Sequence, residues 1–437
     1  MGLKMQRDRL KDLVTWAQDA YRKPLILRGC RQVGKSWLVR EFAKQFESFV
    51  EINFEKNKLL HQYFAADLDI PTLLEKLSIQ TRTKIVPGKT LVFFDEIQTC
   101  EGALQSLRYF KEDLPELHVI AAGSLLDFAL NKIGLPVGRV QFMQLHPLSF
   151  GEYLSVLGNQ ELRDFIFKNE NDPVLHKQLM DHLRNYMWLG GMPAVIDAWI
   201  KDRDSVICQN IQDEIIESYQ IDFHKYTKQH ETPSVTKVFE TIPAMLGQKF
   251  IYSKVDTGSR SEIVKNALLL LETAGIAKRC IHTSAQNPPL GAETDEKKFK
   301  VFYFDIGIAQ RLLGLYLKQW LLNPSPLSNQ GELAEQLVAQ EIIAYSDFHK
   351  RCKLYYWHRE VKNSNAELDF IALKEGSIVP VEVKSSSKGR MKSMQVFLDS
   401  HPHSKFGLKI SEGQFSKHKH LVEIPLYALE SWFTDSK

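Results

Sequence analysis

Short apolar runs are the most regular feature of the first third of the chain. PLILRG (24–29), LVFFDE (91–96) and LHVIAAGS (117–124) are mostly apolar and end in a glycine, an acid or a small polar residue. Such runs are typical of strands buried on both faces of a parallel sheet. SFVEINFEK (48–56) is a further strand candidate, and WLVREFAKQF (37–46) has apolar residues at helical spacing. The pattern predicts an α/β domain with a parallel sheet.

Helical spacing of apolar residues predominates from about residue 155 to 325. SEIVKNALLLLETAGIAKRC (261–280) predicts a helix that stops at Gly275 and is followed by a strand, and KFKVFYFDIGIAQRLLG (298–314) predicts a strand followed by a helix. A helix followed by a strand hairpin is the outline of a winged helix. Many winged helices bind DNA, and others serve as lids or dimer contacts. This one shows no basic recognition face, so DNA contact is its less favoured role.

The last block follows LNPSPLSNQG (322–331), whose two prolines and small polar residues indicate a linker. An amphipathic helix is predicted at 331–346. Strands are predicted at 353–360, 366–373 and 378–386, and a helix, SMQVFLDS, and a strand, KFGLKI, come after them. This order of helix, three strands, helix and strand is that of restriction-endonuclease-like folds.

Composition limits the size and charge of the molecule. The chain has 437 residues, 44% hydrophobic and 25% charged, as in a soluble globular protein of two or three domains. The formal net charge of +3 is close to neutral. The whole molecule therefore lacks the character of a DNA-coating protein, and any surface for nucleic acid must be local.

Cysteine usage and hydropathy indicate the compartment. The five cysteines are scattered, odd in number and never form a C-x-x-C pair, which argues against a disulfide framework or zinc cluster and favours a reducing cytosol. The most apolar stretch, NALLLLETAGIA (266–277), is too short for a membrane span and contains Glu272. We recognise no signal peptide. We expect a cytoplasmic protein without membrane contact.

The loop between the first strand and helix carries the clearest chemistry. GCRQVGKS (29–36) fits the P-loop pattern G-x-x-x-x-G-K-S in its required context of strand, loop and helix. Its glycines let backbone N–H groups curl toward a polyphosphate, and the helix N-terminus favours the same anion. A chance glycine turn is disfavoured by the flanking elements. The candidate ATP-binding residues are Gly29, Cys30, Arg31, Gln32, Val33, Gly34, Lys35, Ser36 and Trp37.

Individual side chains of a P-loop have separate roles. Lys35 would reach the β- and γ-phosphates, and Ser36 would ligate Mg²⁺. At the end of LVFFDE, Asp95 would hold Mg²⁺ through water, and Glu96 would polarise the attacking water. An ordinary strand with a charged end would leave the spacing of the two motifs unexplained. Ser124 could touch the γ-phosphate or the water, although a turn serine is equally consistent. The extra strand between the two motifs marks the P-loop class with a catalytic glutamate.

The last block contains the pattern Asp-(x)n-Glu-x-Lys of nucleases. Glu382 and Lys384 lie two apart on one strand and therefore point to the same face. Asp369 and Glu382 would bind Mg²⁺, which lowers the pKa of a bound water, and Lys384 would orient that water or stabilise negative charge. Glu335, on the preceding helix, could add a carboxylate to the metal site.

The alternative is a solvent-facing strand whose charges prevent edge pairing. However, ELDFI places an acid among apolar residues, where it needs a partner or a metal. The pattern therefore favours a nuclease-type site, and whether it cleaves stays open.

Basic residues and histidines are frequent near the C-terminus. Residues 385–420 contain seven Lys and Arg against two Asp and Glu, a local balance of +5 that would suit phosphates or be a solvated face. The four histidines of this region show no metal-ligand spacing, and we expect surface residues at His401, His403, His418 and His420.

Several motifs together resemble a large prokaryotic family of AAA+-like P-loop ATPases: RGCRQVGKS, LVFFDEIQ, AAGS, VGRVQFMQLHPLSFGEYL (137–154) and YMWLGGMPAVIDAW (186–199). The likeness covers nearly the whole chain. Cys30 stands where the family commonly has proline and Ser36 replaces threonine, and neither change removes a needed atom.

In that family the ATPase domain is followed by a domain of unknown function. The resemblance implies an ATPase domain at 1–155, a helical domain with a winged helix at 156–325 and a restriction-endonuclease-like PD-(D/E)xK domain at 326–437. Arg139 matches a recurrent arginine of the family and would act as an arginine finger or sensor, or form a structural salt bridge. AAA+-like ATPases often complete their sites across subunits, so a homo-oligomer is one expectation.

Two functional hypotheses follow. In the first, the chain binds and hydrolyses ATP with Mg²⁺ and couples this cycle to binding or cleavage of DNA. In the second, it is a slow nucleotide-dependent switch or scaffold whose last domain is inactive and only binds a partner or DNA. Glu96 argues for the first, because a pure switch could do without it.

Overall fold

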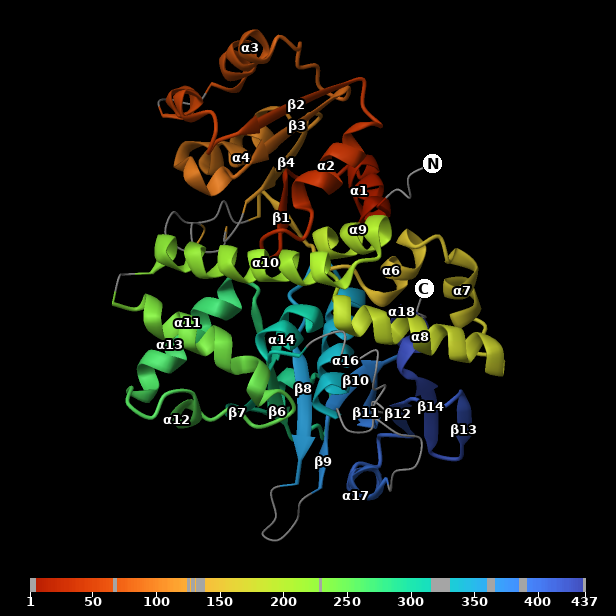
Figure 1. Ribbon diagram of the computed structural model, residues 1–437. Helices are drawn as coiled ribbons and strands as arrows, with labels where there is room; N and C mark the ends of the chain where they lie inside the picture. The colour runs from red at the N-terminus through yellow and green to blue at the C-terminus, as the bar shows by residue number, and fades with distance from the viewer. Residues whose placement is uncertain are drawn as a thin grey trace. The chain divides into compact units, whose positions relative to one another are not determined.

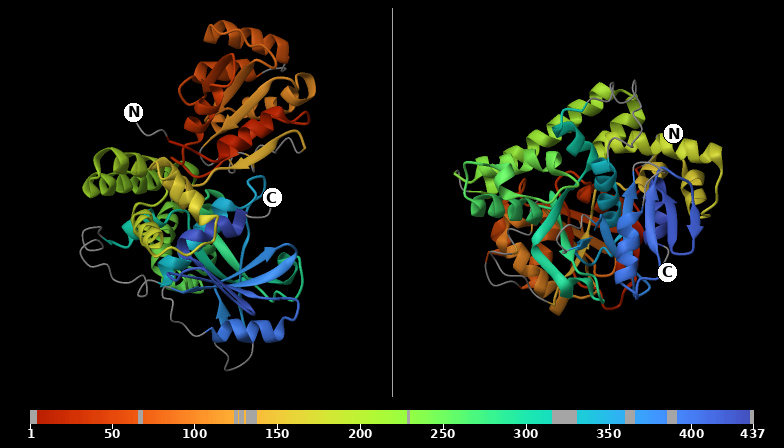
Figure 2. Two further views of the ribbon diagram at one scale, coloured as in Figure 1. Left: turned by 90° about the vertical axis from the view of Figure 1, so that its right-hand side faces the viewer. Right: turned by 90° about the horizontal axis from the view of Figure 1, so that it is seen from below.

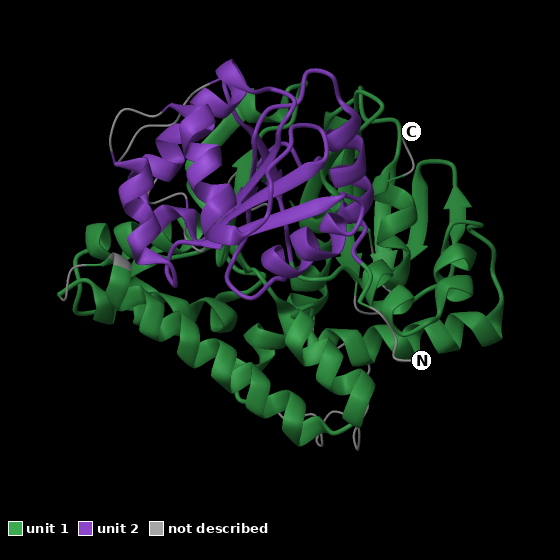
Figure 3. Ribbon diagram, turned by 90° about the horizontal axis from the view of Figure 1, so that it is seen from above, with its two compact units in different colours: residues 1–6, 147–346, 352–437 green, residues 7–146, 347–351 purple. Residues whose placement is uncertain are grey.

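A computed structural model describes residues 5–65, 69–123, 126, 130, 138–227, 230–315, 331–359, 366–384 and 391–434. The chain forms two compact units (Figure 3). The N-terminal unit comprises residues 7–146 and 347–351, and the large unit comprises residues 1–6, 147–346 and 352–437. The two later predicted blocks thus share one unit. The boundaries of the three predicted domains remain predictions.

The N-terminal unit is built on the predicted parallel sheet. Its five strands lie in the order β2-β3-β4-β1-β5 and all neighbours are parallel. Every residue of β3 and β4 is buried, which explains their continuous apolar sequence. The α/β fold class and its parallel sheet are therefore confirmed. The strands are β1 (Leu25–Arg28), β2 (Ser48–Asn53), β3 (Thr90–Asp95), β4 (His118–Ala122) and β5 (Gln141–Gln144).

Helices cover both faces of this sheet (Figure 1). Alternate residues of β3 face one core, in which Phe94 packs against Phe110 of α4 with ring centroids 5.8 Å apart. α2 packs against β3 and β4 and contacts α1. The P-loop helix is thereby fixed to the sheet that also carries the acidic strand. The helices are α1 (Arg9–Gln18), α2 (Lys35–Ala43), α3 (Ile70–Thr81) and α4 (Glu101–Asp113), with 3₁₀ turns at Lys58–Phe64 and Ile97–Thr99.

Helices predominate in the first half of the large unit, as the periodicity predicted. Asp172 and Asp204 cap α8 and α10, since each carboxylate accepts two backbone N–H groups of the first turn. The helices of this unit are α6 (Phe150–Val156), α7 (Gln160–Ile166), α8 (Pro173–Leu189), α9 (Pro193–Asp202), α10 (Ser205–Tyr226), α11 (Thr232–Thr241), α12 (Tyr252–Val255), α13 (Ser261–Thr273), α14 (Ile306–Leu312), α16 (Gly331–Tyr345), α17 (Lys392–Ser400) and α18 (Leu429–Thr434). The predicted linker lies outside the described residues except for Gly331, which begins α16.

The predicted helix and hairpin are present but belong to a larger sheet. α13 is followed by the antiparallel strands β6 (Ala277–Thr283) and β7 (Thr294–Tyr303). β6 also pairs in parallel with β8 (Leu354–His358), which in turn pairs with β9 (Glu367–Leu368). The middle and last blocks therefore build one sheet, β7-β6-β8-β9. The winged helix itself stays a prediction.

A second sheet of the large unit has the order β10-β11-β12-β14-β13. Its blue strands lie side by side, with α17 below them, in the left view of Figure 2. Helix, strands, helix and strand follow in the predicted order, but the strand predicted at 366–373 is broken at Asp369 into β9 and β10. The five strands are β10 (Phe370–Lys374), β11 (Ser377–Lys384), β12 (Gly407–Ser411), β13 (Ser416–His418) and β14 (Leu421–Pro425).

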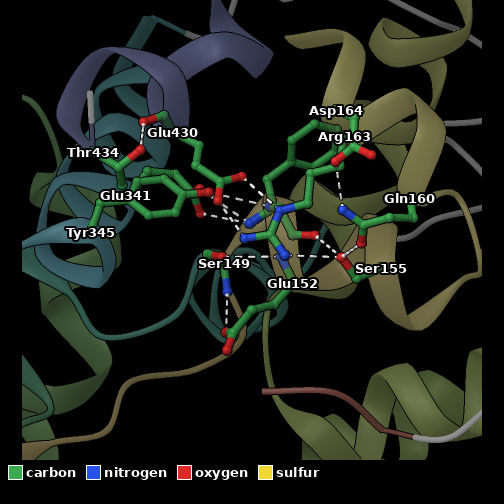
Figure 4. A network of polar contacts seen from close by, with 12 residues as sticks. Ser149, Glu152, Ser155, Gln160, Arg163, Asp164, Glu341, Tyr345, Glu430 and Thr434 are labelled. Carbon is green, nitrogen blue, oxygen red and sulfur yellow. Dashed lines mark hydrogen bonds and ion pairs between the residues drawn. The ribbon is translucent and has the colours of Figure 1, made fainter. Parts of the chain in front are cut away.

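A buried polar network ties the start of the large unit to its end (Figure 4). Arg163 of α7 forms an ion pair with Glu430 of α18. The carboxylate of Glu341, on α16, accepts the backbone N–H of Phe150 at 3.1 Å and the hydroxyl of Tyr186 at 3.0 Å. Burial raises the pKa of Glu341 to about 7. The segment after the N-terminal unit is therefore anchored to the last block by buried charges.

The surface prediction for the histidines is wrong for His401. Its ring is buried and stacks on Phe397 with centroids 3.8 Å apart, and its Nε2 lies 2.9 Å from the carbonyl oxygen of Ser284. The ring thus fills the core beneath β8. His403, His418 and His420 are exposed, as expected. None of the helices in the described ranges is long and apolar enough to cross a membrane.

Candidate functional site

The P-loop has a backbone that depends on its glycines. Gly29 and Gly34 have φ angles of 146° and 91°, and Gln32 between them has 64°. A Cβ atom on Gly29 would lie 2.2 Å from the carbonyl oxygen of Leu145. Glycine is therefore required at 29 by both space and conformation, and at 34 by conformation. Cys30 and Val33 are buried, whereas Gln32 is exposed.

Lys35 closes this loop. Its Nζ donates to the carbonyl oxygens of Gly29 at 2.8 Å and Cys30 at 2.9 Å, and the residue is only 9% exposed. Burial lowers the pKa of Lys35, and the nearby carboxylates of Glu96 and Asp95 oppose this shift. A cation is thereby held over the concave side of the loop, as binding of a polyphosphate requires.

Ser36 and Asp95 meet beside the loop. The Ser36 hydroxyl donates to Asp95 Oδ2 at 3.1 Å, and the Asn53 side-chain amide donates to the same oxygen at 3.2 Å. Burial and the charge of Glu96 raise the pKa of Asp95, and these hydrogen bonds oppose the shift. A hydroxyl and a carboxylate in contact are hard oxygen donors, so this pair fits Mg²⁺.

Glu96 adopts a left-handed backbone with φ of 51°, a conformation that strains a non-glycine residue. Its Oε2 accepts a hydrogen bond of 2.6 Å from the side-chain amide of Gln98. The other amide atom, Gln98 Oε1, is buried, and a Cβ on Gly123 would lie 1.8 Å from it. The Gln98 amide therefore lies between the carboxylate and the end of β4. Ser124, the next residue, lies outside the described residues.

Two arginines of the N-terminal unit, Arg139 and Arg7, have structural partners. Arg139 Nε pairs with Glu112 Oε1 at 2.7 Å on the surface, where the Arg139 side chain is 47% exposed. Of the alternatives predicted for Arg139, the structural salt bridge is therefore present, and the role as an arginine finger or sensor stays a prediction. Sequence reasoning missed Arg7, whose buried guanidinium donates to the carbonyl oxygens of Val33 at 2.9 Å and His146 at 2.6 Å. Arg7 braces the loop, and an isolated arginine 26 residues upstream gave no signal of it.

The nuclease-pattern residues come together in the large unit. Lys384 Nζ lies 2.5 Å from Glu382 Oε1 on β11, and Asp369, between β9 and β10, accepts the N–H of Val383 at 2.8 Å. Glu335 lies on α16, and its charge interacts with that of Asp369. All four predicted side chains therefore belong to one cluster.

A lysine that the sequence analysis missed lies inside this cluster. Lys300 comes from β7, is 1% exposed, and places its Nζ 3.2 Å from Glu335, 2.8 Å from Glu367 and 3.6 Å from Asp369. Glu367 was missed too. The sequence carries one signal for Lys300: this lysine stands in the apolar strand KFKVFY and shares a strand face with Phe302.

Burial and charge set the protonation of the cluster. Burial, followed by the charge of Asp369, raises the pKa of Glu382 to about 7. Burial alone would lower the pKa of Lys300, but the charges of Glu335 and Asp369 outweigh it and raise that pKa. The cluster therefore keeps Lys300 charged.

The cluster fits one divalent cation held by Glu382 and Asp369 rather than a metal site that also uses the carboxylate of Glu335. Glu382 is 6% exposed, and its Oε2 is buried without a hydrogen-bond partner in the described part of the chain. Such an oxygen near Asp369 suits a hard cation. Glu335, by contrast, is paired with Lys300. Within the described ranges, no group of three or more His, Cys, Asp or Glu residues is arranged to hold a metal ion.

Comparisons with known proteins assign domains to the chain. An AAA domain family matches residues 21–154, and two domains of unknown function, DUF8612 and DUF4143, match residues 180–319 and 330–429. No curated protein matches the chain.

Similar solved structures include the Aeropyrum pernix ORC1 protein in complex with DNA, at 11% identity and a TM-score of 0.28, covering 72% of this chain and 95% of that one. A STAND ATPase with a tetratricopeptide repeat sensor from Pyrococcus horikoshii matches at 10% identity and 0.31, covering 79% of this chain and 48% of that one. Neither similarity is close enough to indicate function. The AAA match and the P-loop geometry support ATP binding and hydrolysis by the N-terminal unit.

Proposed function

We propose that this chain is an ATPase whose ATP cycle controls how the large unit engages DNA. The observation that carries the ATPase part is the contact of Ser36 with Asp95 beside Lys35 and the curled P-loop. The DNA part is supported by the cluster of Asp369, Glu382 and Lys384.

The N-terminal unit would work as follows. Loop N–H groups and Lys35 bind the polyphosphate, and Ser36 and Asp95 would hold Mg²⁺, which neutralises phosphate charge when bound. Glu96 accepts a proton from the attacking water. The 2.6 Å hydrogen bond from Gln98 orients the Glu96 carboxylate.

The large unit offers less positive surface than its sequence suggests. Of the basic residues between 385 and 420, Lys409 is buried and pairs with Glu423 at 2.9 Å. Lys392, Lys405, Lys417 and Lys419 are exposed. Lys388 and Arg390 lie outside the described residues. The four exposed lysines support a local phosphate contact.

A second candidate function is that of a nucleotide-dependent switch, in which the nuclease-type cluster binds DNA or a partner without cleavage. The ion pairs of Lys300 with Glu335 and Glu367 favour it, because they occupy carboxylates that could otherwise bind metal.

Phosphate release by the purified chain, with and without DNA, tests the proposal. Lys35→Ala should lose nucleotide binding, and Glu96→Gln should bind ATP but hydrolyse it at least about 100-fold more slowly. DNA should stimulate the wild type. Hydrolysis by Glu96→Gln at the wild-type rate would remove Glu96 from the mechanism.

Plasmid and linear DNA, incubated with Mg²⁺ or Mn²⁺ and with or without ATP, separate the two candidates. Cleavage that is absent in both Asp369→Ala and Lys384→Ala supports the nuclease. Retained DNA binding without cleavage under every condition supports the switch.

A further inference from the structure

Lys300 belongs to a part of the chain that no nuclease motif includes. β7 comes from the middle block, whereas Glu335, Glu367 and Asp369 come from the last. The ammonium group nevertheless lies within 3.6 Å of all three carboxylates. Lys300 is therefore an integral part of the cluster, because a surface side chain would not be buried to this degree and contact three acids.

The surrounding contacts fix Lys300 in place. On α16, next to Glu335, the Gln336 side chain accepts the N–H of Tyr303 at 2.7 Å and donates to its carbonyl oxygen at 2.8 Å. Phe302, on the same strand face as Lys300, packs against Phe370 with ring centroids 5.4 Å apart. These contacts hold β7 against α16 and against the second sheet, next to the cluster.

The cluster contains more acidic than basic side chains. Four acidic side chains, Glu335, Glu367, Asp369 and Glu382, gather around two lysines, Lys300 and Lys384. Carboxylates in such proximity, with Glu382 buried and the other three partly buried, are unfavourable unless a cation compensates them. A divalent cation can provide that compensation. Here a covalently attached ammonium group does so for Glu335 and Glu367, while Asp369 lies farther from it, at 3.6 Å.

We propose that Lys300 is the resident cation of the nuclease-type cluster and excludes a divalent cation from Glu335 and Glu367. Asp369 and the unpartnered Oε2 of Glu382 then remain for a single exchangeable divalent cation. Lys300 is a positioning residue, because it fixes carboxylates. The inference rests on the proposed nuclease-type site and is independent of ATP hydrolysis.

Mn²⁺ binding to the full-length chain tests the proposal directly. Lys300→Met keeps an apolar stem of similar length but removes the charge. We expect Lys300→Met to bind one Mn²⁺ per chain more than the wild type, measured by calorimetry and by the loss of the free Mn²⁺ magnetic resonance signal without nucleotide. Its thermal midpoint should fall without metal and recover when Mn²⁺ is added.

Lys298→Met is the matched control. It lies on the same strand two residues earlier, is partly exposed, and pairs with Asp295, which is not part of the cluster. Its Mn²⁺ stoichiometry and the metal dependence of its thermal midpoint should equal those of the wild type. Equal stoichiometry in Lys300→Met and the wild type would overturn the proposal and reduce Lys300 to an ordinary structural ion pair.

Glu335→Gln keeps the proposal testable if Lys300→Met does not fold. Because Lys300 already occupies Glu335, this substitution should leave Mn²⁺ stoichiometry unchanged. A lower stoichiometry would show that metal displaces Lys300 and would refute the proposal. The DNA and ATP assays test the proposed function separately from the role of Lys300. If the wild type cleaves no DNA but Lys300→Met gains a Mn²⁺ site, the nuclease function fails and the inference about Lys300 stands.

Discussion

Replacing Gln98 by alanine tests how Glu96 is held. The amide N–H of Gln98 donates to Glu96 Oε2 at 2.6 Å, a short hydrogen bond to a charged acceptor. Hydrogen bonds of this type contribute about 1.5–3 kcal/mol. If the bond orients Glu96 only for hydrolysis, its loss lowers kcat by about 10- to 100-fold, at roughly 1.4 kcal/mol per tenfold change. ATP affinity should stay the same, because Gln98 makes no contact with Lys35 or Ser36 among the hydrogen bonds of the described residues.

Gly123 provides an independent way to break the same bond. A Cβ at this position would lie 1.8 Å from Gln98 Oε1, so Gly123→Ala must displace the amide. Gly123→Ala should therefore lower kcat in the wild type but add little to Gln98→Ala, because the two changes remove one interaction. Phosphate release at saturating ATP and nucleotide affinity by fluorescence measure both quantities. An unchanged kcat in Gln98→Ala, or equal losses of kcat and ATP affinity, would refute the reasoning.

Three further predictions concern stability and subunit contacts. Arg163→Ala should destabilise the large unit by about 3–5 kcal/mol in urea unfolding, because it removes the cation from the buried carboxylate of Glu430; the double variant with Glu430→Ala should lose less, and an additive loss would contradict this. Burial raises the pKa of Glu341 to about 7 from 4.5, so its contribution of about 3 kcal/mol is fully present below pH 4.5 and is lost as the pH rises through 7; unfolding between pH 5 and 8 should show this slope in the wild type and not in Glu341→Gln. Arg139→Ala should abolish hydrolysis and leave ATP affinity nearly unchanged if Arg139 acts as a finger. If it acts across subunits, mixing with Glu96→Gln subunits should restore part of the hydrolysis, because only sites with an intact Glu96 and a neighbouring intact Arg139 work. Equal loss of both hydrolysis and affinity would exclude the finger.

The N-terminal unit was predictable because its strands are buried on both faces. β3 and β4 need apolar residues at every position, so their sequences differ visibly from those of amphipathic helices. The P-loop requires glycines for its backbone, and Gly29 shows why: a side chain there would collide with Leu145. Steric requirements of this kind leave a signature in a single sequence.

The large unit was less predictable because its sheets join distant segments. The parallel pairing of β6 with β8 has no local signal, since it depends on contacts between residues more than 70 positions apart. At the break at Asp369 the carboxylate accepts the N–H of Val383, which lies on another strand, so the alternating pattern gives no sign of this contact. His401 was misjudged for a similar reason, because its partners Phe397 and Ser284 lie on two different elements.

Both candidate sites need residues beyond those that act on a ligand, and one physical requirement explains why. A motif specifies the acting groups, but a carboxylate held partly away from water also needs a donor or a cation within the protein. Gln98, the last residue of LVFFDEIQ, supplies the donor for Glu96, and Lys300, outside any motif, supplies the cation for Glu335. A partner such as Lys300 can come from a distant element, so spacing does not reveal it. A polar residue in an otherwise apolar strand, as Lys300 is in KFKVFY, is the trace that this requirement leaves in the sequence.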